Sequence, residues 1–184
     1  MMDIEYIRQF FPAALQDAPV FRKYMIKEFI QLMILDYLSS SRFAKKLVFI
    51  GGTNLRLAKG IDRFSEDLAF DCKGFSEEDF EEMTQKVLTH LRRNGLGVEL
   101  KNRDNGRLKA FRSNLHFPGL LFEMGLSGHR EERFLIKLEC QDQLVHYNVV
   151  HADIKGCGFY FPFPVPPDPV LCAMKTSAML SRRK

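Results

Sequence analysis

Apolar residues recur at three- and four-residue intervals between residues 18 and 38. This periodicity predicts a helix with a wide buried face. A second helix is predicted from Ser76, which resembles a capping box together with Asp79, to about Arg93. A final helix is predicted to begin near Pro169. Long helices are therefore expected at both ends of the chain and in its middle.

Shorter runs rich in β-branched and aromatic residues predict strands. Residues 46–50 form an apolar run that stops at Gly51-Gly52, and Thr53 is expected to cap a helix that ends near Gly60. In residues 67–71 the large apolar side chains occupy every second position, which places Asp67, Ala69 and Asp71 together on one face of a strand. The further predicted strands are residues 98–100 and 108–117, which form a hairpin around Asn105-Gly106, and residues 120–126, 133–140 and 145–154.

The proline-rich residues 159–170 are expected to form an extended connector between the last strand and the final helix. The order of these elements predicts an α/β (α+β) fold class, with a mixed or antiparallel sheet flanked by helices. A chain of 184 residues is long enough for one substantial domain.

Composition adds modest constraints. A net charge of +4 is compatible with a polyanionic partner without requiring one. The four cysteines are dispersed and are expected to be free thiols. The N-terminus has no signal-peptide pattern, and the most apolar stretch is short and contains Asp36, so a cytoplasmic protein without a membrane span is expected.

Gly51-Gly52-Thr53 follows a strand and opens a helix, an arrangement that suits a phosphate. Glycines let the backbone approach a bulky anion, and a helix start offers unpaired N–H groups. Arg56, one turn on, could add a guanidinium. The alternative is an ordinary tight turn. The stretch lacks the lysine of a P-loop, so a Walker-type NTPase is not supported.

The acids of residues 67–71 suit a divalent ion beside that phosphate, because Mg²⁺ favours one or two carboxylates plus phosphate oxygens. Asp67 comes first, and the position two residues later, where a second carboxylate would share the ion, is Ala69. The alternative is that Asp67 and Asp71 are solvated acids at the end of a strand.

Residues 51–71 resemble the first signature of the AbiEii family of nucleotidyltransferase-like toxins, which includes the MenT-type toxins. The family pattern is Gly-Gly-Thr/Ser-x-Leu-Arg, followed by Arg-x-Ser-x-Asp-Leu-Asp-Phe. At Ala69 this sequence departs from the pattern, because the family has its second Asp there. The matching residues are Gly51, Gly52, Thr53, Leu55, Arg56, Arg63, Ser65, Asp67, Leu68 and Phe70.

Two later segments are similar to the family as well. Residues 134–140 resemble the strand with the third acid, which would be Glu139, and the segment from Val170 resembles the one that places the family's lysine at Lys175. The resemblance implies a nucleotidyltransferase-like domain over residues 1–165. Residues 166–184 would start a C-terminal helical region that is cut short relative to the family.

The resemblance implies a nucleotidyltransferase-β-like mixed sheet and transfer of a nucleotide from an NTP with Mg²⁺ to an RNA, in some members the 3′ end of tRNA. It also implies a cognate antitoxin, in a toxin–antitoxin or phage-defence system. The implied catalytic residues are Asp67, Glu139 and Lys175, with Asp67 and Glu139 as metal ligands. The implied nucleotide-binding residues are Gly51, Gly52, Thr53, Arg56, Arg63 and Ser65.

Ala69 leaves three explanations open: an engineered inactivating change, a natural degenerate member that binds nucleotide without turnover, or replacement by Asp71. The corresponding alternative function is a non-catalytic nucleotide- or partner-binding protein on the same fold. A basic region around the predicted hairpin could follow an RNA backbone, or could simply be a solvated face. Its residues are Arg92, Arg93, Lys101, Arg103, Arg107, Lys109 and Arg112.

Overall fold

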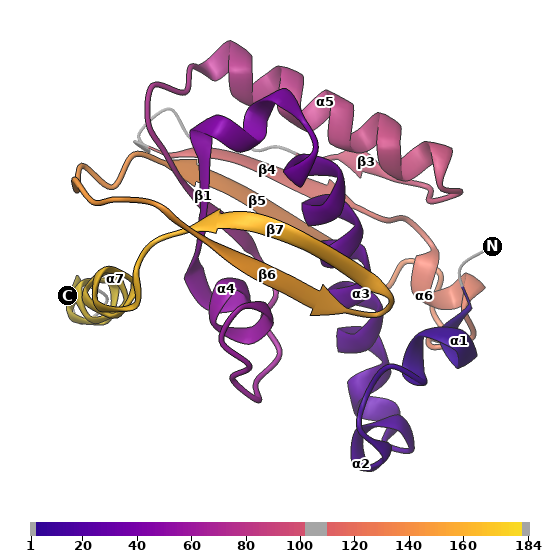
Figure 1. Ribbon diagram of the computed structural model, residues 1–184. Helices are drawn as coiled ribbons and strands as arrows, with labels where there is room; N and C mark the ends of the chain where they lie inside the picture. Colours follow the sequence, from indigo (N-terminus) through magenta and orange to yellow (C-terminus); the bar gives the residue numbers. More distant parts are fainter. Residues whose placement is uncertain (1–2, 102–109, 182–184) are drawn as a thin grey trace.

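The computed structural model describes residues 3–101 and 110–181, and its centre is a five-stranded sheet (Figure 1). The strand order is β1-β2-β5-β4-β3, in which β2 and β5 are parallel and the other pairs are antiparallel. The predicted mixed sheet is therefore confirmed. The strands are β1 Leu47–Ile50, β2 Leu68–Cys72, β3 Glu99–Leu100, β4 Phe111–His116 and β5 Leu135–Gln141.

Helices and a separate hairpin surround this sheet. The hairpin consists of β6 Val150–Gly156 and β7 Phe159–Val165, which pair along their whole length. In Figure 1 the hairpin and the long helix α3 lie in front of the sheet. The helices are α1 Ile4–Arg8, α2 Ala13–Gln16, α3 Pro19–Ser39, the 3-10 helix η1 Arg42–Lys46, α4 Gly51–Leu57, α5 Glu77–Arg93, α6 Leu120–Glu123 and α7 Asp168–Ser181.

One face of the sheet is apolar and forms the core. Phe49 of β1 pairs with Phe70 of β2, and both rings pack against Phe163 of β7, with ring centroids 5.9 Å and 6.0 Å from that of Phe163. All three side chains are almost completely buried. The hairpin thus covers the core face of β1 and β2, the two strands next to the candidate site.

Strand β7 corrects the prediction of an extended connector, because residues 159–165 are regular strand. Pro162 and Pro164 lie opposite Asp153 and His151 in the ladder. The two prolines are two residues apart, so their nitrogens point to the same side. In a two-stranded ribbon, N–H groups on the outer side make no ladder bond, and their loss costs nothing there. The prolines are therefore compatible with a strand that the composition argued against.

Three other predictions need correction. Residues 120–126 are not a strand: Gly119, with φ of +72°, turns the chain into the short helix α6. Residues 145–149 are irregular, so the last predicted strand begins only at Val150. Helix α4 begins at Gly51 rather than after Thr53, which lies inside its first turn. Local turn geometry and packing decided these cases.

The predicted long helices are confirmed as α3, α5 and α7. Ser76 and Asp79 form the predicted capping box at the start of α5. Strands β3 and β4 form the predicted antiparallel pair, although its turn at Asn105-Gly106 is outside the described residues. All four cysteines are free, as predicted. No helix in the described parts of the chain is long and apolar enough to cross a bilayer.

Candidate functional site

The face of the sheet opposite the core has a row of polar side chains. Along β2, Asp67, Ala69 and Asp71 alternate with the buried Leu68 and Phe70. The predicted common face of the three positions is therefore present, and β2 itself begins one residue after Asp67. Alternation in the neighbouring strand β5 extends this polar face across the sheet.

The strand register aligns the candidate acids. Ala69 lies opposite Glu139 of the parallel strand β5, and Glu139 lies opposite Arg112 of β4. One rung away, the Lys137 ammonium contacts the Asp67 carboxylate. Asp67 and Glu139, which are 72 residues apart in sequence, therefore belong to one surface, with Ala69 between them.

The glycine pair lies directly against this surface. Gly51 has a φ of +83°, and a Cβ on it would lie 3.1 Å from Cβ of Ala69. A Cβ on Gly52 would lie 2.7 Å from Oγ of Ser65. Both glycines thus pack closely against the second half of the signature, and the left-handed backbone of Gly51 favours glycine there.

The first turn of α4 is fixed to the neighbouring strands by side chains. The Thr53 hydroxyl donates a hydrogen bond to the carbonyl oxygen of Asp67, and the amide of Asn54 donates to the carbonyl oxygen of Phe49 at 2.8 Å. Thr53 and Asn54 are buried. The threonine that was expected to cap the helix instead couples the glycine turn to the first acid.

Asp67 and Glu139 each form an ion pair with a neighbouring cation. Asp67 Oδ2 accepts from Lys137 Nζ at 2.8 Å. Glu139 accepts from Arg112 through both oxygens, at 2.8 Å from Nε and 3.2 Å from Nη2. The pairs are partly exposed, with side-chain exposures of 27% to 44%. Such pairs contribute little to stability, but they set the charge of this surface.

This set of side chains does not fit the divalent ion that the fold family implies. Mg²⁺ needs carboxylate oxygens free to coordinate, and two-metal transfer needs a carboxylate shared between ions. Here Asp67 and Glu139 are each bound to a cation, and the side chain between them is a methyl group. Among residues 3–101 and 110–181 there is no group of three or more His, Cys, Asp or Glu side chains suited to a metal.

Asp71, at the far end of the same face, has a different role. It is fully buried, and it accepts from the backbone N–H of Gln143 at 2.9 Å and from the Tyr147 hydroxyl. Burial, together with the hydrogen bond to Asp71, raises the pKa of Tyr147. Both oxygens of Asp71 thus hold the irregular segment 142–149 against the sheet.

Replacing Asp71 by alanine should lower the free energy of unfolding by about 1–3 kcal/mol, because two donors would lose their buried acceptor. Urea denaturation followed by circular dichroism measures this change. Asp142→Ala is the matched control, since its exposed carboxylate accepts from Leu144 N within the same segment. An equal loss in both variants would show that Asp71 does not anchor the segment.

Arg56, expected at a phosphate, is used elsewhere in this structure. Its Nε donates to Glu28 of α3 at 2.9 Å, its Nη1 lies 3.2 Å from Asp62, and its guanidinium stacks over Phe64. Burial raises the pKa of Glu28, against the opposing effect of Arg56. Arg56 therefore fixes the loop after α4 to α3. Arg63, by contrast, is exposed on that loop.

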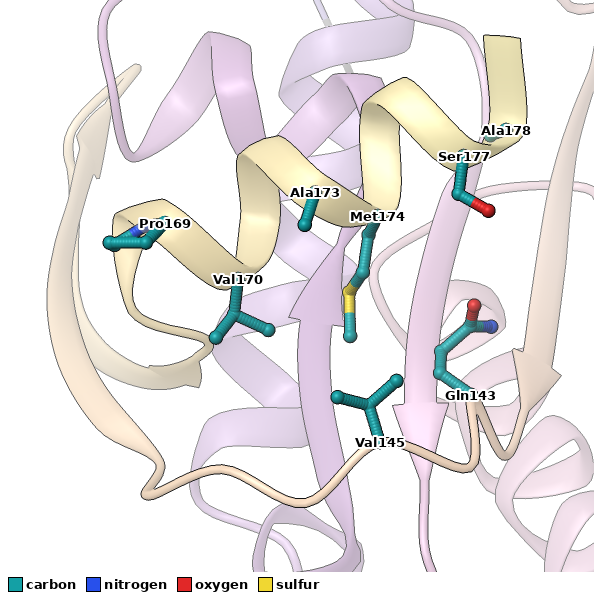
Figure 2. A pocket seen from close by; sticks show the side chains of 8 residues that line it. All are labelled: Gln143, Val145, Pro169, Val170, Ala173, Met174, Ser177 and Ala178. Atoms are coloured by element: carbon teal, nitrogen blue, oxygen red, sulfur yellow. The ribbon is translucent and has the colours of Figure 1, made fainter. Parts of the chain in front are cut away.

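Lys175 is exposed on α7, outside the sheet that contains the row of acids. One face of α7 and the 142–149 segment line an open pocket of about 570 Å³. Figure 2 shows Met174 pointing from the helix toward Val145 across this pocket. Lys175 is not among its lining residues, which are Gln143, Val145, Pro169, Val170, Ala173, Met174, Ser177 and Ala178.

Sequence reasoning missed the two cations of the site. Lys137 precedes Glu139 by two residues and so had to share its face, a signal that was available in the strand pattern. Arg112 was assigned only to the basic region. Within that region Arg92 donates to the carbonyl oxygen of Val98, and Arg112 is paired with Glu139. Arg103, Arg107 and Lys109 lie outside the described residues.

Comparison with known proteins gives this site a context. No curated protein is similar enough to count as a match. Among solved structures, MenT4, a nucleotidyltransferase toxin from Mycobacterium tuberculosis, superposes with a TM-score of 0.63 at 19% identity, covering 97% of this chain and 59% of its own. JHP933 from Helicobacter pylori superposes with a TM-score of 0.53 at 20% sequence identity. The superposition covers 83% of this chain and 55% of the JHP933 chain.

These structures share the fold, and the chain spans less than two thirds of their length. The family described as "Nucleotidyl transferase AbiEii toxin, Type IV TA system" matches residues 33–184, which include the glycine turn, both acids and α7. The chain therefore belongs to the AbiEii nucleotidyltransferase toxin family.

Proposed function

We propose that this chain is a nucleotidyltransferase-type toxin domain that binds an NTP at the Gly51-Gly52 turn and presents it to an RNA acceptor, such as tRNA, with transfer weakened by Ala69. The observation that supports it best is the packing of both glycines against the Ser65–Ala69 half of the signature. This packing places the backbone of the turn next to Ala69, in the row of side chains that begins with Asp67.

The proposed roles follow from position. Gly51, Gly52 and Thr53 would contact the triphosphate, with Ser65 and Arg63 beside them. Asp67 and Glu139 would face the reacting phosphate. In the family this is the place of Mg²⁺, which would supply charge neutralisation, but the paired acids of this chain do not provide its ligand set.

Arg56 and Lys175 are proposed to neutralise phosphate charge only after a rearrangement. Arg56 must leave its ion pairs with Glu28 and Asp62, and Lys175 must reach inward from the exposed side of α7. We further propose a cognate antitoxin, a cytoplasmic location and a role in phage defence. The division into a nucleotidyltransferase-like domain, residues 1–165, and the start of a helical region, residues 166–184, is part of the same proposal.

A second candidate is a non-catalytic nucleotide-binding protein on the same fold. The ion pairs of Asp67 and Glu139 favour it, because both acids are neutralised within the protein itself. Tight NTP binding by the natural protein without transfer to any RNA would support this candidate. Labelled RNA formed from labelled NTP by the same protein would support the first.

Replacing Gly52 by alanine tests NTP binding at the glycine turn. The added Cβ would meet Ser65 Oγ at 2.7 Å, so that the turn or Ser65 beside it must shift, and we expect about 10-fold weaker binding, equivalent to ~1.4 kcal/mol. Isothermal titration calorimetry with each of the four ribonucleoside triphosphates measures it.

Gly128→Ala is the matched control, because a Cβ there has nothing within 4 Å and the backbone is not left-handed. Its affinity should equal that of the unchanged chain. Equal affinity of both variants, or no binding by the unchanged chain, would contradict the proposed nucleotide site.

A further inference from the structure

Two cations occupy the surface at which the family places a divalent ion. Lys137 and Arg112 come from neighbouring strands and contact Asp67 and Glu139, at 2.8 Å in each case. Glu139 and Arg112 share the rung of Ala69, and the Asp67–Lys137 pair lies on the same face one rung away. The two cations and Glu139 are therefore held by the sheet, and Asp67 lies at the end of the segment that enters β2.

The charges of these four groups cancel. Two carboxylates give two negative charges, and the ammonium and guanidinium give two positive charges. A carboxylate at position 69 would leave one negative charge in excess and would attract a cation. With alanine there, an approaching Mg²⁺ meets two acids that each already have a cationic partner.

Donors remain for an anion. An ammonium has three N–H donors and a guanidinium has five, and the pairs use one of Lys137 and two of Arg112. Both side chains are partly exposed, Lys137 to 35% and Arg112 to 40%. A phosphate oxygen can therefore be bound on the open side of each cation while the acids remain neutralised.

We propose that Lys137 and Arg112 replace the divalent ion in this chain, so that the polyphosphate of an NTP is bound without metal. The inference rests on the proposed function, because it concerns the same nucleotide. It changes what that binding requires: the positive charge is built into strands β4 and β5. Asp67 then opposes NTP binding, whereas a metal ligand would support it.

Calorimetric titration of an NTP, in excess EDTA and in Mg²⁺, tests the inference. The unchanged chain should bind with the same affinity in both, within about threefold. Lys137→Met should weaken binding in EDTA by about 10-fold or more, equivalent to ~1.4 kcal/mol. Lys46→Met is the matched control, since Lys46 forms a comparable ion pair, 2.7 Å from Asp79 on α5, and its affinity should not change.

A second variant predicts a change in the opposite direction. Asp67→Asn removes the negative charge beside Lys137 and should tighten binding in EDTA by about 3- to 10-fold. A lost metal ligand would weaken binding instead. Because one substitution should weaken and the other should tighten, general damage to the fold cannot imitate the expected pair of results.

The outcomes separate this inference from the proposed function. Binding that needs Mg²⁺ overturns metal-free binding and leaves the nucleotide site in place. Binding in EDTA that does not change with Lys137→Met, or that weakens with Asp67→Asn, overturns the roles of these residues. No binding in either buffer overturns both proposals.

Discussion

Replacing Phe163 by alanine is expected to lower the free energy of unfolding by about 3–5 kcal/mol, the usual cost of removing a buried aromatic ring from a core. Phe163 is completely buried and packs on Phe49 and Phe70, the aromatic residues of β1 and β2. These strands lead into the glycine turn and contain the position of Ala69. The cavity left by the ring would therefore lie directly beneath the candidate site.

Urea denaturation followed by circular dichroism measures this loss as a lower midpoint. Tyr160→Ala is the control on the same strand, because its ring is 64% exposed, and it should cost less than about 1 kcal/mol. Equal effects of the two substitutions would show that the β6–β7 hairpin is not part of the core. Such a result would contradict the packing on which the site strands depend.

The same strand shows where sequence reasoning failed. Prolines lower the expectation of a strand, and residues 159–165 were predicted as a connector. The alternation of buried Phe161, Phe163 and Val165 with the exposed Tyr160 and Pro162 was nevertheless present. An edge position makes such prolines harmless, but whether a strand lies at an edge depends on tertiary contacts. For this segment, the alternation of apolar and polar residues therefore predicted the strand better than the proline content did.

Elements with strong local signals were predicted well. The capping box of α5 and the alternation of β2 are set by neighbouring residues, and both are present in the structure. Because β2 alternates, the common face of Asp67 and Ala69 could be predicted from sequence alone. The short helix α6 could not, since the left-handed Gly119 in the turn before it decides its direction.

The partners of the charged residues were beyond local reasoning. Lys137 and Asp67 are 70 positions apart, and Arg112 and Glu139 are 27 apart. These pairs depend on the order and register of strands, which hydrophobic patterns do not specify. Arg56 is similar, because its pairing with Glu28 depends on where α3 lies relative to α4. The acids could therefore be placed on one face, but their ion-pair partners could not be predicted.

Restoring a carboxylate at position 69 should have the largest effect on activity. Ala69→Asp adds a third acid between Asp67 and Glu139, so the surface gains one negative charge beyond its two cations. Gly51 next to position 69 has no Cβ, so no side chain of the turn competes for this position. We expect Mg²⁺-dependent transfer of labelled nucleotide to RNA to rise by about 100-fold or more, since a bound ion supplies several kcal/mol to such a step.

Mn²⁺ binding and nucleotide transfer, both measured on the natural protein and its variants, test this expectation. Mn²⁺ binding, followed by electron paramagnetic resonance without nucleotide, should appear in Ala69→Asp and not in the unchanged chain. Ala69→Asn is the matched control, because it has nearly the same size without the charge, and it should gain neither Mn²⁺ nor transfer. If Ala69→Asp binds Mn²⁺ no better and transfers no more than Ala69→Asn, then the missing carboxylate is not what limits this protein. In that case the glycine turn and the row of acids serve a purpose other than nucleotidyl transfer.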